Sequence, residues 1–169
     1  MPKSPKPRRT PLYSVAERER RDSSPWTKVQ GVLAIVQFAV FLVSLSLVLR
    51  YLATGDGYLA ATFSIVTKTL VLYAIMITGS IWERDVFGQY LFAPAFFWED
   101  VVSMLVLALH TAYLFAVFTH FLDARGQMLL ALAAYATYAV NAAQFLWKLR
   151  LARLDAGIPY TQPMTGGVR

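Results

Sequence analysis

The chain has 169 residues, of which 57% are hydrophobic and 15% are charged, and its formal net charge is +6. Apolar residues in this proportion, gathered in long runs, exclude a soluble domain of this size and predict an integral membrane protein. The sequence holds no cysteine and two histidines, which excludes disulfides, thiolate metal sites and cysteine nucleophiles and leaves a catalytic zinc without its usual ligands.

The first predicted region is a basic, proline-rich N-terminal extension, residues 1–28. Lysine and arginine gather here and again after the last apolar run. This distribution is typical of membrane topology and not of nucleic-acid binding, so we expect no nucleic-acid partner. Within the extension, Ser14 and Glu17 have the spacing of a capping box. They indicate either a short charged helix on the membrane surface or a solvated segment that directs topology.

The membrane domain is predicted to span residues 29–148 and to contain four transmembrane helices, because a spanning helix needs about 20 apolar residues. The connections TGDG and LDARG are short, so the first two spans and the last two each form a hairpin. The fold class is therefore an all-α integral membrane protein with a compact four-helix bundle. The four spans are Val29 to Ala53, Tyr58 to Trp82, Ala95 to His120, and Gln127 to Trp147.

The basic residues at both ends of the membrane domain predict that both termini are cytoplasmic. The longer connection ERDVFGQYLFAPAFF, between the second and third spans, then lies on the cytoplasmic side as well. Residues 149–169 are predicted to be a basic, disordered tail. The chain is expected to cross its membrane several times.

Polar side chains recur along the first and fourth spans. Polar groups within hydrocarbon are costly, so they normally face the bundle interior and often mark function. On the first span Gln30, Gln37 and Ser44 recur every seven residues and share one helical face. The amides have two interpretations, hydrogen bonding between helices or substrate binding. The stripe on the fourth span consists of Tyr138, Asn141, Gln144 and Lys148.

The third span begins with two adjacent acids, Glu99 and Asp100, after an aromatic stretch. His110 returns to the same helical face as Glu99 and lies about 16 Å below it, at a rise of 1.5 Å per residue. Lys68 on the second span reaches a similar depth, and we expect a structural role for it rather than a chemical one. Glu83 ends the second span in the same interfacial zone as Glu99 and Asp100. Those two acids also have a purely structural interpretation, because acids at the start of a helix stabilise its free N–H groups.

These groups predict a pocket that opens at the cytoplasmic interface, with carboxyls at its mouth and amides and a histidine below. Its aromatic wall would include Trp82, Phe97 and Trp98, although tryptophans at this depth also follow the aromatic-belt rule. A carboxyl group in such an apolar setting can keep its proton near neutral pH and act as a general acid. Because the polarity fades toward the opposite face, a transporter or channel is disfavoured.

Three motifs resemble a known family: IWERDVFGQYLFAPAFFWEDVVSMLVLALHTAYL, SPWTKVQGVLA and AAYATYAVNAAQFLWKLR. Together they are similar to the 3-vinyl bacteriochlorophyllide hydratases of bacteriochlorophyll biosynthesis, over roughly Pro11 to Leu154. The resemblance implies hydration of the 3-vinyl group of chlorophyllide a, or of 3-vinyl bacteriochlorophyllide a, to a 3-(1-hydroxyethyl) group. It implies no cofactor, since the magnesium ion belongs to the substrate. It also implies a location in a bacterial inner or intracytoplasmic photosynthetic membrane.

Vinyl hydration requires a general acid, a base that positions water and groups that tolerate a developing cation. We expect Glu99 or Asp100 to be the acid, with Glu99 preferred because it shares a face with His110. The other acid and Glu83 would act as base or charge stabiliser. His110 would either orient water or bind the pigment magnesium as an axial ligand. The predicted substrate contacts are Trp82, Trp98, Phe97, Gln37, Asn141, Gln144, Tyr138, Arg84 and Lys148.

A second functional class is consistent with the same residues. A non-catalytic protein that binds bacteriochlorophyll, or that assists photosystem assembly, would use the aromatic pocket and His110 to hold a chlorin without changing it. Arg84 and Lys148 could pair with the pigment propionate or simply anchor helix ends at the interface. Whether the protein forms a homo-oligomer is left open by the sequence.

Overall fold

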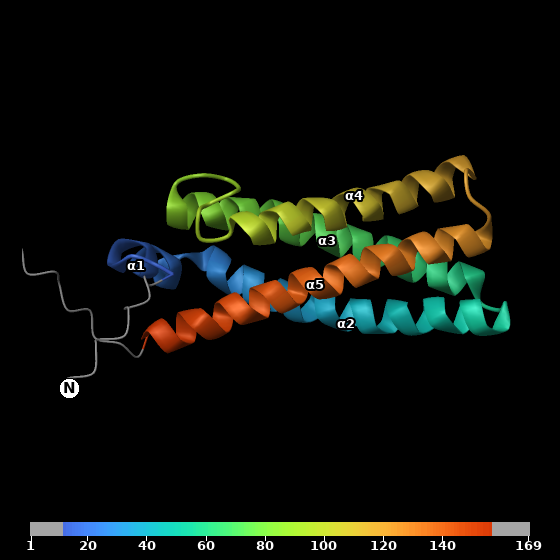
Figure 1. Ribbon diagram of the computed structural model, residues 1–169, viewed down its shortest axis with the longest axis horizontal. Helices are drawn as coiled ribbons and strands as arrows, with labels where there is room; N and C mark the ends of the chain where they lie inside the picture. Colours follow the sequence, from blue (N-terminus) through green and yellow to red (C-terminus); the bar gives the residue numbers. More distant parts are fainter. Residues whose placement is uncertain (1–11, 157–169) are drawn as a thin grey trace, which may run out of the picture.

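The computed structural model describes residues 12–156, and these residues form five helices and no strand (Figure 1). Four of the helices are long and apolar enough to cross a membrane, so the expected all-α, four-span architecture is confirmed. The predicted tail beyond residue 156 and the first residues of the extension lie outside the described part. The helices are α1 (Val15–Ser23), α2 (Pro25–Thr54), α3 (Tyr58–Phe87), α4 (Phe97–Thr119) and α5 (Ala124–Ala156).

Three of the four spanning helices extend further than the apolar runs that predicted them, and α4 is slightly shorter than its predicted span, Ala95 to His120. Helix α3 continues past Trp82 to Phe87, and α5 continues past Trp147 to Ala156. A helix does not end where hydrocarbon ends, because its backbone hydrogen bonds persist into the interface and beyond. The predicted spans were therefore correct in number and order, and three of the four were too short.

Short turns join the helices into two hairpins. Gly55 and Gly57 both have positive φ, 79° and 87°, in the turn between α2 and α3, a conformation that glycine adopts without a Cβ clash. The closest pairs of helices are α2 with α3 and α4 with α5, and contacts of α2 with α5 and of α3 with α4 close the bundle. Both predicted hairpins are confirmed, and Figure 1 shows the long helices running side by side.

Helix α1 begins with the predicted capping box. The Ser14 backbone N–H donates to the Glu17 carboxylate at 2.7 Å, and the Glu17 N–H donates to the Ser14 hydroxyl at 3.3 Å. The first of these bonds, more than any other contact, holds the pKa of Glu17 below its ordinary value. The helix is fastened to the end of α3, since Arg20 Nε donates to the Val86 carbonyl at 2.8 Å.

Buried carboxyl groups gather at the end of the bundle near α1, whereas the opposite end contains the buried amide of Gln127, which accepts from the Tyr58 hydroxyl. The apolar core of the bundle is centred on large buried side chains from all four long helices. A second, smaller aromatic cluster lies beside α1. The main core includes Phe41, Val48, Ile65, Leu72, Val106, Tyr113, Met128 and Tyr135, and the smaller cluster is Tyr13, Val86 and Phe96.

Candidate active site

Two buried carboxyl groups hold the connection between α3 and α4. The Phe92 N–H donates to Asp100 Oδ2 at 2.7 Å, and the Ala93 N–H donates to Glu83 Oε2 at 3.2 Å. The two carboxyls also lie within hydrogen-bonding reach of each other. Such a bond needs a proton on one of them, since an ionised carboxylate can only accept. Glu83 and Asp100 thus form a pair that can share one proton.

The backbone of Phe92 explains why a carboxyl is needed at this point. Its φ of 61° places a non-glycine residue in the left-handed region, which is unfavourable by about 1–2 kcal/mol. The hydrogen bond from its N–H to Asp100 offsets part of that cost. Asp100 therefore has a structural task in addition to any chemical one.

Glu99 is buried beside the pair but has different partners. Its Oε2 atom has no hydrogen-bond partner within residues 12–156, and the Lys148 ammonium lies 3.6 Å away. Lys148 also donates to the Ala95 carbonyl, so it is fixed at the start of α4. Glu99 Oε2 is therefore ion-paired with Lys148 but accepts no hydrogen bond from the described residues.

Asn141 connects α5 to α4 at this level. Its Nδ2 donates to the Glu99 carbonyl at 2.9 Å, and its Oδ1 accepts from the Ser103 hydroxyl at 3.2 Å. Both ends of the amide are satisfied by α4. Of the two interpretations of this residue, hydrogen bonding between helices accounts for every contact that Asn141 makes.

A second polar group, Lys68 with His110, lies deeper in the bundle. Both side chains are completely buried, and Lys68 Nζ is 3.1 Å from His110 Nε2. The Val106 carbonyl lies 2.8 Å from His110 Nδ1 and can only accept, so Nδ1 donates and Nε2 accepts from the lysine. The predicted equal depth of Lys68 and His110 is confirmed, while their direct contact was not predicted.

Aromatic rings surround the Lys68 ammonium. Its Nζ lies 4.0 Å from the centre of the Tyr138 ring and 5.1 Å from that of Tyr135. Cation–π attraction of this kind helps a buried ammonium that has no ion pair. Because both nitrogens of His110 already have protein partners, it could bind a pigment magnesium only after Lys68 had moved away. Tyr138 serves this deeper group and does not reach the carboxyls through any hydrogen bond among the described residues.

The structure does not bring all the predicted aromatic and cationic residues to the carboxyls. Trp98 is 68% exposed and Phe97 is 44% exposed, so both lie at the outer surface. Trp82 donates to the Thr27 hydroxyl at 2.9 Å and packs edge-on against Phe96, which keeps it near the site. Arg84 is exposed and donates to the Tyr90 hydroxyl. The predicted aromatic wall is thus only partly present.

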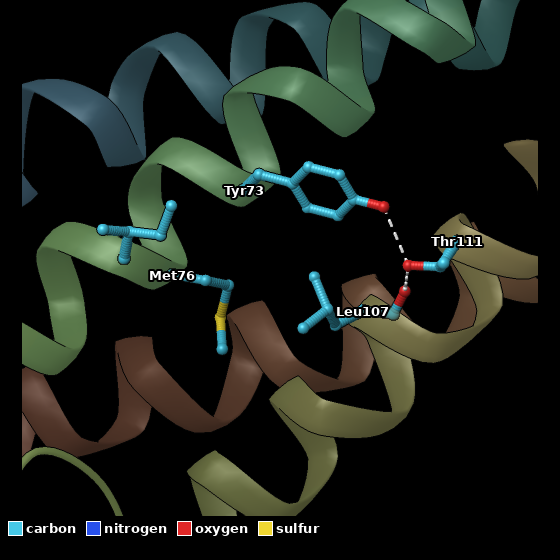
Figure 2. Close-up of a pocket in the computed structure, with 5 residues that line it drawn as sticks. Tyr73, Met76, Leu107 and Thr111 are labelled. Carbon is cyan, nitrogen blue, oxygen red and sulfur yellow. Dashed lines mark hydrogen bonds between the residues drawn. The ribbon is translucent and has the colours of Figure 1, made fainter.

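A cavity of about 310 Å³ lies between α3 and α4, away from the predicted mouth. Figure 2 shows Tyr73 and Met76 facing Leu107 and Thr111 across it. The Tyr73 and Thr111 hydroxyls share a hydrogen bond of 2.8 Å, and Ile77 completes the lining. None of its lining residues was a predicted site residue, because isolated hydroxyls and apolar side chains carry no signal in a spanning helix.

The described residues contain no cluster of three or more histidine, cysteine, aspartate or glutamate side chains able to hold a metal ion. The groups that they do bring together are two neighbouring carboxyls that can share one proton, an ion-paired carboxylate and a buried amide. This set can supply a proton, accept a proton and stabilise positive charge within an apolar bundle.

Comparison with known proteins gives the family. A family model described as 2-vinyl bacteriochlorophyllide hydratase matches residues 13–151. The chain belongs to this family. The expected family resemblance is therefore confirmed, although the relatives' names give the vinyl-bearing carbon the number 2 and the systematic ring numbering gives it the number 3.

Two curated relatives carry the same description, 2-vinyl bacteriochlorophyllide hydratase. The protein from Rhodobacter capsulatus is 66% identical over 157 residues, covering 92% of this chain and 91% of its own. The protein from Cereibacter sphaeroides is 64% identical over 155 residues, covering 91% of this chain and 96% of its own. No solved structure matches the chain significantly.

Proposed function

We propose that this protein is a hydro-lyase of bacteriochlorophyll biosynthesis that adds water to the vinyl group of a chlorophyllide or bacteriochlorophyllide. The product would carry a 3-(1-hydroxyethyl) group. The observation that carries the proposal is the 66% identity, over 92% of the chain, to a protein named as a hydratase of this vinyl group. The buried carboxyls at one end of an apolar bundle supply the acid and base that the reaction needs.

The proposed orientation places both termini in the cytoplasm, following the excess of lysine and arginine at the two ends of the membrane domain. The carboxyl cluster, which consists of Glu83, Glu99 and Asp100, then lies at the cytoplasmic interface of a bacterial inner or intracytoplasmic membrane. A flat apolar macrocycle would enter the bilayer while its propionate remained at that interface. Lys148, and the exposed Arg84, lie at the level where such a carboxylate would remain.

The Glu83–Asp100 pair is the proposed proton donor. Protonation of the terminal CH₂ of the vinyl group breaks the π bond and leaves positive charge on the carbon beside the ring. Release of the shared proton leaves two carboxylates, whose negative charges would stabilise the developing carbocation. Asp100 and Glu83 are better placed to hold this proton than Glu99, which we preferred on helical periodicity alone.

Glu99 is the proposed base and charge stabiliser. Its Oε2 atom is ion-paired with Lys148 but accepts no hydrogen bond among residues 12–156, so it can accept a proton from the attacking water. Its negative charge would also stabilise the carbocation next to the ring. The Lys148 ammonium lies 3.6 Å from the same oxygen and adds a positive charge at this site. Neither step changes an oxidation state, which is why we propose no cofactor.

The test is to incubate membranes containing the protein with chlorophyllide a and to follow the red absorption band together with the product mass. The expected result is a pigment with a blue-shifted band that is heavier by one water. Pigment that binds and leaves unchanged would overturn the proposal. That result would favour the alternative, a non-catalytic pigment-binding or photosystem assembly protein.

A further inference from the structure

Gln37 is a buried amide without a protein partner. Its side chain is 2% exposed, and neither Nε2 nor Oε1 makes a hydrogen bond within residues 12–156. Gln30 occupies the same face of α2 two turns earlier, and its Nε2 donates to the Thr78 hydroxyl at 2.7 Å. Buried polar groups are nearly always paired. Gln144 Oε1 and a few other buried atoms also lack a partner, but Gln37 differs because both of its polar atoms are unpaired among the described residues.

The level of Gln37 in the bundle follows from the contacts on either side of it. On α2 it lies midway between Gln30, which bonds to Thr78, and Ser44, which bonds to Ser64 at 2.7 Å. It therefore faces the stretch of α3 midway between Ser64 and Thr78. Lys68 and Leu72 are buried in that stretch, so Gln37 lies near the level of the Lys68–His110 pair.

Contacts with α5 place Gln37 on the cytoplasmic side of that pair. Phe41, one turn further along α2, packs against Tyr138 with ring centres 4.9 Å apart. Helices α2 and α5 run in opposite directions (Figure 1), so one turn back along α2 corresponds to one turn forward along α5. That turn brings Asn141, whose amide contacts Ser103 and Glu99. Gln37 thus lies between the Lys68–His110 pair and the Glu99 level.

Two structural roles for Gln37 fail on these contacts. An amide that ties helices together needs a partner on another helix, and Gln37 has none among the described residues. An amide that snorkels to the interface would be exposed, and this side chain is enclosed. The Gln37 amide has one strong acceptor and two donors, so a small ligand that both donates and accepts hydrogen bonds would match it. Water has these properties and fits an enclosed polar site.

We propose that the Gln37 amide binds the water molecule that is added to the vinyl group. Gln37 Oε1 accepts a hydrogen bond from the water and Nε2 donates one to it, which holds the water on the inner side of Glu99. This inference rests on the proposed hydratase function and adds a binding site for the second substrate of that reaction.

The atoms of the step balance. The carboxyl pair gives a proton to the vinyl CH₂, the water oxygen forms a bond to the carbon beside the ring, and Glu99 takes one proton from that water. Transfer of this proton back to the carboxyl pair restores the starting state. The net change is the addition of one water, with no oxidant or reductant.

The test is a matched pair of variants, Gln37→Leu and Gln30→Leu, assayed for hydration and for thermal unfolding in the same detergent. Gln37→Leu is expected to lower kcat by about a hundredfold, leave the KM for chlorophyllide a unchanged, and leave Tm unchanged or higher. Gln30→Leu should keep kcat within about twofold and lower Tm, because it loses the bond to Thr78. If Gln37→Leu fails to insert, Gln37→Met serves in its place.

A second readout separates water binding from a general structural effect. Lowering the water activity with sucrose should leave the wild-type rate unchanged, because its water site is saturated, and should lower the rate of Gln37→Leu further. The inference is overturned if Gln37→Leu keeps kcat within about twofold, or if it loses Tm as Gln30→Leu does. Wild-type protein that hydrates no pigment would overturn the proposed function itself, and this inference with it.

Discussion

The carboxyl cluster and the Lys68–His110 pair are two buried polar regions of one bundle, and they are stabilised in different ways. The carboxyls are satisfied by backbone N–H groups of a loop and by Lys148. The lysine is satisfied by one imidazole and the faces of aromatic rings. The first arrangement leaves one proton that can be exchanged and a carboxylate oxygen that accepts no hydrogen bond from the described residues. The second leaves the histidine with both nitrogens occupied, so we assign chemistry to the carboxyls and a structural role to the pair.

The largest expected effect comes from removing the proton of the carboxyl pair. Asp100→Asn keeps an oxygen that accepts from the Phe92 N–H, so the loop should fold, but the amide cannot donate a proton as a carboxyl does. Hydration should fall by about 10²–10⁴-fold, measured as product mass per unit time on membranes with matched protein content. Asp56→Asn, in the exposed turn between α2 and α3, is the control. Full turnover in Asp100→Asn would contradict the assignment.

The next largest effect should come from splitting the lysine–histidine pair. Lys68→Met leaves His110 Nε2 buried without a donor and should cost about 1–3 kcal/mol of stability. Adding His110→Leu removes the orphaned nitrogen, so the double variant should recover part of that loss. Thermal unfolding of the two single variants and the double variant gives the coupling. Hydration that falls about a hundredfold in Lys68→Met without loss of stability would instead give this pair a chemical role.

A smaller effect is expected at Asn141. Asn141→Leu removes the bonds to the Glu99 carbonyl and to Ser103, and should cost about 1–2 kcal/mol of stability. The KM for chlorophyllide a should stay unchanged, since the amide is fully used between helices. A KM that rises about tenfold with unchanged Tm would restore the substrate-binding interpretation of this residue.

The smallest effect should come from the cap of α1. Ser14→Ala removes the hydroxyl that accepts from the Glu17 N–H at the start of α1. This change should destabilise the helix by about 1 kcal/mol. The pKa of Glu17 is lowered in the folded protein, so its stabilisation is present above the ordinary pKa and is lost as the pH falls through the lowered value. Proteolysis of the N-terminal segment as a function of pH, in wild type and Ser14→Ala, measures the loss of helix stability in the variant and the pH dependence that Glu17 causes. Equal cleavage in the two proteins at neutral pH would contradict this account.

Several features of the fold follow directly from local patterns in the sequence. Four apolar runs of sufficient length gave four spans, and the Ser14–Glu17 spacing gave the start of α1. The face shared by Glu99, Ser103, Val106 and His110 is buried along its whole length. These features depend on one helix at a time, so chain length and helical periodicity were enough to predict them.

The features that were missed depend on how one helix is rotated against another. Helix α3 is apolar on most of its surface, so periodicity could not show which of its sides faces α4 or that Lys68 would meet His110. The contacts of Glu83 and Asp100 depend on loop N–H groups, which no side-chain pattern records. The outward position of Trp98 was missed because a tryptophan at the membrane interface can face either the bundle interior or the lipid.

The central claim is that the carboxyl cluster adds solvent water to the vinyl group of a chlorin. The most direct measurement is the mass of the pigment after incubation of the wild-type protein with chlorophyllide a in H₂¹⁸O, with Asp100→Asn in parallel. The account predicts a wild-type product heavier by one labelled water and an unchanged pigment with the variant. An unchanged pigment with the wild type, or equal label uptake in both proteins, would contradict it.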